Sequence, residues 1–164
     1  MILSSEEKDC IHSLICSALD NLYIHDLYLI RNKVNERSIV NRFSIYFQEK
    51  LSQNGYADYN LDVEYNKDHS NLKRTINFPR GTYPDVIVHK RGSNEYNLCI
   101  IEFKPWWRSN TDRDILKLRD FSNQEGDYGY GIGLSIILSV NAIHIKTIVN
   151  GVVVESTQRN TVRL

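Results

Sequence analysis

Two acidic residues and a lysine stand at the margins of two apolar runs in the middle of the chain. Asp85 directly precedes the run 86–88, and Glu102 and Lys104 lie at the end of the run that starts at Leu98. Charged side chains in such runs are costly to bury without a partner. A divalent cation held by Asp85 and Glu102 would compensate them, polarise a phosphoryl oxygen and lower the pKa of a bound water. Lys104 would orient that water or stabilise the charge of the pentavalent phosphoryl group.

A plain ion pair is the alternative interpretation of the same three residues. Lys104 would pair with Asp85 or Glu102, and the arrangement would be purely structural. Side chains alternate along a strand, so Glu102 and Lys104 share one face with Ile100, whereas Phe103 points the other way. The two interpretations therefore require the same placement of the side chains and differ in whether a metal ion is bound.

The pattern resembles the motif of a known superfamily. Pro84-Asp85 followed by Glu102-x-Lys104 is similar to the signature of PD-(D/E)xK nucleases, the restriction-endonuclease-like proteins. Further matching stretches resemble an uncharacterised bacterial group within this superfamily, at residues 36–39, 64–66 and 84–91. The resemblance covers most of residues 36–120 and leaves the first 30 residues out. It implies an α/β fold in which helices flank a mixed central sheet.

The resemblance also implies an activity and roles for particular residues. It implies a nuclease, more specifically an endonuclease, that hydrolyses phosphodiester bonds in DNA, with RNA not excluded, and depends on Mg²⁺ or on Mn²⁺ as a substitute. Asp85, Glu102 and the carbonyl oxygen of Phe103 would be the metal ligands, and Lys104 would be the catalytic lysine. Such nucleases often pair to cut both strands, so a homodimer or a subunit of a larger system is expected.

Two acids compete to complete this site. In the superfamily an acid on an early helix often lines the metal site, and Glu36 is the match. An acid in the first turn of a helix is also favoured by the helix dipole, whatever its chemistry. Glu64, on a strand that alternates apolar and polar residues, is the other candidate. Lys117, on a later helix, would touch a phosphate or simply belong to a solvated helix face.

The overall charge limits how the protein would bind nucleic acid. The chain has 20 basic and 20 acidic residues, so bulk charge does not attract a polyanion. A basic stretch surrounds Asp85, and four of its residues are candidate nucleic-acid contacts: Lys73, Arg74, Lys90 and Arg91. Trp106 and Trp107 follow the motif and would either stack on bases or close a hydrophobic core. A catalytically inactive binding or assembly subunit that keeps the nuclease fold is the alternative function.

The composition favours one folded domain in the cytoplasm. The chain has 164 residues, no repeat and no low-complexity linker, so we expect a single domain in which a helical segment, 1–30, precedes a core, 36–164. No apolar run is long enough to cross a bilayer, and the first residues lack the blocks of a secretion signal. Three cysteines without metal-type spacing favour reduced thiols. We therefore expect an intracellular protein without a membrane partner.

Local signals predict the elements that must position these residues. Ser4 and Glu7 form a capping box for a first helix, and Asn35 caps a second that runs to about residue 51. Asn150-Gly151 predicts a hairpin over 142–155. A helix capped by Asn110 or Thr111 separates the strands, which requires a crossover connection and an α/β sheet. The expected strands cover residues 61–65, 85–89, 97–103 and 134–140.

Overall fold

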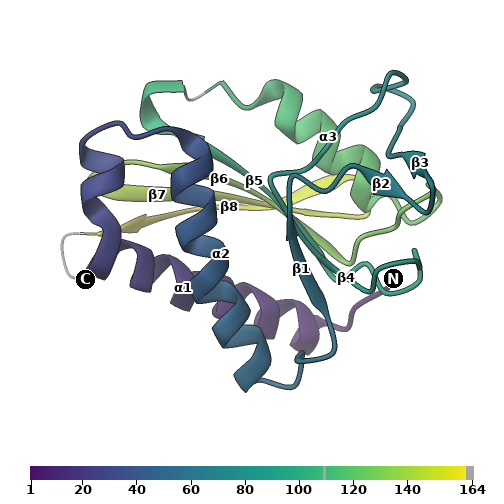
Figure 1. Ribbon diagram of the computed structural model, residues 1–164, viewed down its shortest axis with the longest axis horizontal. Helices are drawn as coiled ribbons and strands as arrows, with labels where there is room; N and C mark the ends of the chain where they lie inside the picture. The colour runs from purple at the N-terminus through teal and green to yellow at the C-terminus, as the bar shows by residue number, and fades with distance from the viewer. Residues whose placement is uncertain (109, 162–164) are drawn as a thin grey trace.

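A mixed six-stranded sheet with helices on both faces carries the residues singled out above (Figure 1). The structure is a computed structural model, and it describes residues 1–108 and 110–161. The elements, in chain order, are α1 (Ser5–Arg31), α2 (Glu36–Gln53), β1 (Asn60–Val63), β2 (Lys67–Asp68), β3 (Asn71–Leu72), β4 (Val86–His89), β5 (Cys99–Pro105), the short 3-10 helix η1 (Trp106–Arg108), α3 (Asp112–Ser122), β6 (Ile132–Leu138), β7 (Ala142–Val149) and β8 (Val152–Asn160). The predicted single-domain α/β class is confirmed.

The sheet has the strand order β1-β4-β5-β6-β7-β8, and only the pairing of β5 with β6 is parallel within the described residues. The chain passes from β5 through η1 and α3 before it enters β6, which is the crossover that a parallel pair needs. The hairpin between β7 and β8 turns at Asn150 and Gly151, whose φ angles are 46° and 72°. Positive φ at both positions is what a two-residue hairpin turn of type I′ requires, and Asn-Gly adopts it readily.

Local caps set the starts of the first two helices. The Ser4 hydroxyl accepts a hydrogen bond from the Glu7 amide, and the Glu7 carboxylate accepts one from the Ser4 amide at 2.7 Å. The Asn35 side chain accepts from the Ser38 amide at 2.9 Å. Each cap satisfies amides that have no partner inside the helix. The second cap matters for the site, because it makes Glu36 the first residue of α2.

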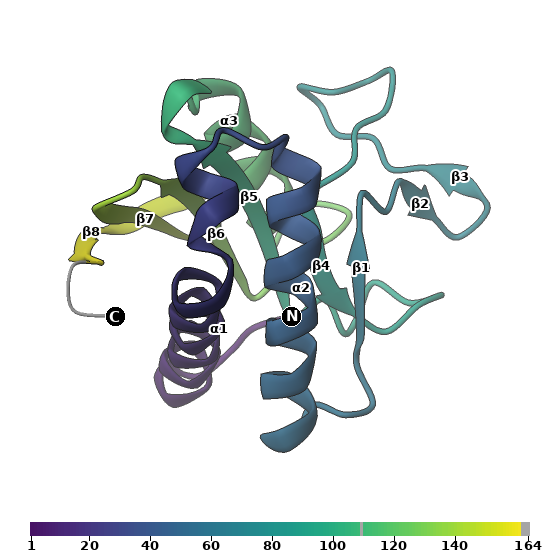
Figure 2. The same ribbon diagram turned by 60° about the vertical axis from the view of Figure 1, so that its left-hand side comes forward.

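Two apolar layers hold the sheet between helices. The larger core lies between the sheet and α1 and α2, and includes Phe43, Ile101 and Phe103. The smaller core lies on the other face, where Ile100 of β5 packs with Leu118 of α3 and their neighbours. Figure 2 shows α3 and most of α1 on opposite sides of the sheet. Because side chains alternate along β5, Glu102 and Lys104 lie on the α3 side of the sheet.

The segment between β1 and β4 contains further secondary structure. Strands β2 and β3 form a small separate hairpin there, and Lys73, which follows it, is buried. The three cysteines are unpaired, as expected. Within the described residues, no helix combines the length and the apolar character needed to cross a membrane.

Candidate active site

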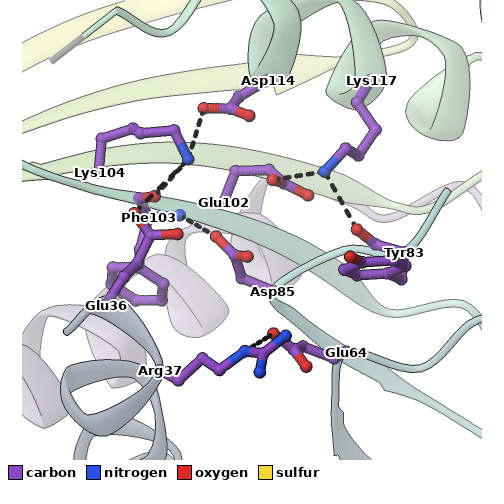
Figure 3. A network of polar contacts seen from close by, with 10 residues as sticks. All are labelled: Glu36, Arg37, Glu64, Tyr83, Asp85, Glu102, Phe103, Lys104, Asp114 and Lys117. Carbon is purple, nitrogen blue, oxygen red and sulfur yellow. Dashed lines mark hydrogen bonds and ion pairs between the residues drawn. The ribbon is translucent and has the colours of Figure 1, made fainter. Parts of the chain in front are cut away.

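Oppositely charged side chains from α2, β5, α3 and the start of β4 gather at one place on the molecule (Figure 3). We call them the charged cluster, which consists of Glu36, Asp85, Glu102, Lys104, Asp114 and Lys117. Four carboxylates face two ammonium groups, so negative charge is in excess when all six are ionised. Segments far apart in the sequence contribute to the cluster because α2 and α3 lie on either side of β5.

Glu102 is the most enclosed carboxylate of the cluster, with 1% of its surface exposed. Its Oε2 accepts a hydrogen bond from Nζ of Lys117 at 2.7 Å, and Lys117 also donates to the carbonyl oxygen of Tyr83 at 3.1 Å. Its Oε1 is buried and has no hydrogen-bond partner. Burial and the negative charge of Asp85 raise the pKa of Glu102 well above its usual value, although Lys117 opposes the shift.

Lys104 lies between the carboxylates of Asp114 and Glu36. Neither the metal-site interpretation nor the ion-pair interpretation names these two as partners of Lys104. Its Nζ lies 3.2 Å from Oδ2 of Asp114 and 3.6 Å from Oε2 of Glu36, and it donates to the carbonyl oxygen of Phe103 at 3.1 Å. The contact with Asp114 has the distance of an ion pair but not the angles of a hydrogen bond. Burial lowers the pKa of Lys104, but the charges of Asp114 and Glu36 outweigh burial and raise it.

The predicted ion pair of Lys104 with Asp85 or Glu102 is therefore wrong. Lys104 pairs with Asp114 and Glu36, and Glu102 pairs with Lys117. The reason is the direction of the side chains: Glu102 points to the middle of α3, where Lys117 lies, and Lys104 points to its first turn.

Asp85 joins the start of β4 to the middle of β5. Its Oδ2 accepts a hydrogen bond from the amide of Phe103 at 2.7 Å, which fixes the carboxylate beside Glu102. Burial raises the pKa of Asp85, and the bond from Phe103 and the charges of Lys117 and Lys104 oppose this shift. Ionisation of a carboxylate that shares a buried site with other carboxylates costs free energy, unless a cation lies nearby.

A small cavity of about 20 Å³ is lined by Glu36, Glu64 and Asp85, together with Arg37, Val40 and Val63. This volume holds about one water molecule. Glu36 is partly buried, and burial raises its pKa although Lys104 opposes the shift. Glu64 follows β1 and accepts a hydrogen bond from Nε of Arg37 at 2.6 Å. Both candidate acids therefore line the cavity. Glu36 pairs with Lys104, and Glu64 pairs with Arg37.

The donor atoms of the cluster fit a hard divalent cation. Carboxylate and carbonyl oxygens are the ligands that Mg²⁺ prefers, and Oε1 of Glu102 is a buried oxygen without a partner. The distances between the side chains that would supply these ligands are less favourable for a metal ion. Within residues 1–108 and 110–161, no three His, Cys, Asp or Glu side chains lie close enough together to hold a metal ion. Lysine ammonium groups stand against the carboxylates, so a metal ion would require the side chains of Lys104 and Lys117 to move.

Lys73 cannot contact nucleic acid at the surface, because only 1% of it is exposed, and that prediction is wrong. Its Nζ lies over the ring of Tyr128, 4.5 Å from the centroid, and within 6 Å of three further ring centroids. Burial lowers the pKa of Lys73 to about 8. The aromatic residues that surround it come from three places in the sequence, so no local pattern signals this burial.

Two of the other predicted nucleic-acid contacts, Lys90 and Arg91, lie away from Asp85. Lys90 pairs with Asp58 and Arg91 with Asp62, at the end of β4 opposite to Asp85. The acids compensate both cations. Arg74 is exposed, and its role as a nucleic-acid contact stays a prediction.

Asp114 is the residue of the cluster that sequence reasoning missed. It lies in the first turn of α3, where acidic residues are common for electrostatic reasons alone. A signal was present nevertheless, since Asp114, Lys117 and Phe121 are spaced so that they share one helix face with the buried Leu118. Charged residues on the buried face of an amphipathic helix indicate a partner across the interface.

Comparisons with protein-family models, with curated proteins and with solved structures find nothing that matches this chain. The resemblance of residues 84–104 to the nuclease motif remains a prediction. What the protein does must be inferred from the chemistry of the charged cluster and from the fold that holds it.

Proposed function

We propose that the protein is a metal-dependent nuclease that hydrolyses phosphodiester bonds of DNA at the charged cluster. The observation that carries the proposal is the excess of carboxylates over ammonium groups in this cluster, together with the buried, unpartnered Oε1 of Glu102. A protein gains no stability from buried acids that repel one another, so such an arrangement favours a cationic ligand. Phosphodiester hydrolysis is the chemistry that carboxylates and a lysine in this pattern serve.

The roles follow from the contacts of each side chain. Asp85, Glu102 and the carbonyl oxygen of Phe103 would hold Mg²⁺, or Mn²⁺ in its place. The metal ion would polarise the phosphoryl oxygens and lower the pKa of the attacking water. Lys104, whose pKa the neighbouring acids raise, stays protonated near neutral pH and donates hydrogen bonds to the charge that builds up on the phosphoryl group. Glu36 and Asp114 orient Lys104 from α2 and α3.

The fold is consistent with this assignment. A mixed central sheet with helices on both faces is the architecture that the resemblance to restriction-endonuclease-like proteins implies. Asp85, Glu102 and Lys104 come together where the pairing of β4 with β5 ends. The net charge of zero favours a nuclease that selects its substrate over one that binds any polyanion.

A cleavage assay tests the proposal. The purified protein is incubated with supercoiled plasmid and with single-stranded DNA, in Mg²⁺, in Mn²⁺ and in EDTA. We expect cleavage only with a divalent cation, and nicked or linear plasmid if the cuts are internal. D85N and E102Q should abolish cleavage, whereas E49Q, which changes an exposed acid on α2, should not. Cleavage in EDTA, or equal cleavage by E102Q, would contradict the proposal.

The alternative is a binding or assembly subunit that keeps the fold without catalysis, and the direct contact of Lys117 with Glu102 favours it. Thermal unfolding separates the two functions. A metal ion that binds the folded protein alone raises the melting temperature with its concentration. We expect Mg²⁺ or Mn²⁺ to raise the melting temperature of the native protein and of E49Q, but not that of E102Q. Identical melting temperatures with and without metal would support the binding subunit.

A further inference from the structure

A second hollow lies on the same side of the sheet as Glu102 and Lys104. It has a volume of about 320 Å³, within the range of pockets that bind small ligands. We call it the β7 groove and define it by Trp106, Ser135, Ser139, His144, Lys146 and Ser156. These residues come from η1, β6, β7 and β8 and from the position just after β6.

The strand register joins the β7 groove to the charged cluster. Glu102 is paired with Ser135, Ser135 with Lys146, and Lys146 with Ser156, so one row of side chains crosses four strands on one face. The neighbouring row runs from Lys104 through Ile137 to His144. Strands are spaced by about 4.8 Å, which puts Lys146 only about 10 Å from Glu102 across the sheet. A ligand in the groove would therefore reach the cluster.

The groove offers an ammonium group, an imidazole ring and hydroxyl groups. Lys146 and His144 are exposed, and neither forms an ion pair with the residues that the structure describes. None of the described side chains that line the groove is acidic. Lys90 and Arg91, by contrast, are paired with aspartates. The charge of the groove is thus complementary to phosphate.

Trp106 adds an aromatic surface at the same place. It is 39% exposed, and it lines the groove where β5 ends. Its neighbour Trp107 packs against the larger core instead. Lysine, hydroxyl groups and an exposed ring together are the combination with which proteins hold single-stranded nucleic acid, because the ring stacks on a base while the cation binds the backbone.

We propose that the β7 groove binds a single-stranded segment of DNA and leads it to the charged cluster. Trp106 stacks on a base, Lys146 binds a phosphate, and His144 and the serine hydroxyls donate hydrogen bonds to the backbone. A base can stack on Trp106 only when it has left its neighbours in a duplex, so the groove selects unpaired strands. That the bound strand is the substrate rests on the proposed function, whereas binding of the strand in the groove does not.

Binding in EDTA tests the groove without any dependence on metal or cleavage. The measurement is the fluorescence anisotropy of a labelled oligo-dT at several salt concentrations. We expect W106A to weaken binding by about tenfold or more, because a base loses its stacking partner. We expect K146E to weaken it by about tenfold and to reduce the salt dependence. K67A, which changes an exposed lysine on β2, should bind as the native protein does.

Tryptophan emission provides a second readout. W107F leaves Trp106 as the sole tryptophan, and we expect oligo-dT to quench its fluorescence. Unchanged binding by both W106A and K146E, when circular dichroism shows both folded, would overturn the proposal. So would equal affinity for duplex DNA or preference for single-stranded RNA. Binding through the groove without cleavage by the native protein would refute the nuclease alone, whereas cleavage unaffected by both variants would refute the groove alone.

Discussion

Glu102 and Lys117 form a buried ion pair between the sheet and α3, and its energy depends on both partners being present. The pair is held in place by a further bond from Lys117 to the carbonyl oxygen of Tyr83. Removing one partner of such a pair leaves the other charge buried without compensation, whereas replacing both by apolar side chains is often neutral or stabilising. This asymmetry distinguishes a structural contribution of the pair from a catalytic one.

We expect K117M to lower the free energy of unfolding by about 3 kcal/mol, because Glu102 then lacks its partner. The double variant K117M/E102L should recover most of this loss. Urea denaturation in EDTA measures both. R119M, which removes an exposed cation from the same helix, should change stability by less than about 0.5 kcal/mol. If K117M and R119M were equally stable, the ion pair would not hold α3 against the sheet.

At the scale of elements, the packing of the segment between β1 and β4 buries the side chain of Lys73. The ammonium group lies among the rings of Tyr65, Phe121, Tyr128 and Tyr130, and Tyr128 also accepts a hydrogen bond from the amide of Arg74. Such rings attract a cation, but burial still disfavours the charge. The segment therefore carries a group whose protonation opposes folding.

The pH dependence of stability should reveal this group. The pKa of Lys73 is lowered to about 8 in the folded protein, so between about pH 8 and its ordinary pKa the unfolded chain binds more protons. Stability should therefore rise with pH over this window, by about 3 kcal/mol. K73M should lack this rise, and K67M should retain it. The free energy of unfolding in urea, measured at several pH values, checks the expectation.

Elements with local signals were predictable from the sequence, and contacts between elements were not. The capping box at Ser4, the cap at Asn35 and the turn at Asn150-Gly151 each depend on residues within a few positions of one another. The partners of Lys104 and the burial of Lys73 depend on which helix or loop the fold brings to them. Asp85 and Glu102 could be singled out because a charge beside an apolar run needs compensation wherever the chain goes.

At the scale of the whole molecule, the two faces of the sheet differ in their chemistry. The face against α1 and α2 carries the larger apolar core. The face on the α3 side carries the smaller core, Glu102 and Lys104 of the charged cluster, and the β7 groove. The acidic cluster and the cationic groove adjoin one another in a chain whose net charge is zero. This arrangement would suit the proposed capture of a phosphate backbone beside the proposed cation site.

The measurement that tests the central claim most directly is the rate at which the protein cleaves DNA in Mg²⁺, compared between E102Q and E49Q. Both variants neutralise one carboxylate, but only E102Q alters the charged cluster. We expect E49Q to cleave at the native rate and E102Q to be slower by about a hundredfold or more, as when a group that stabilises the transition state is removed. Equal rates for the two variants, or no cleavage by the native protein in either Mg²⁺ or Mn²⁺, would contradict a nuclease site at the charged cluster.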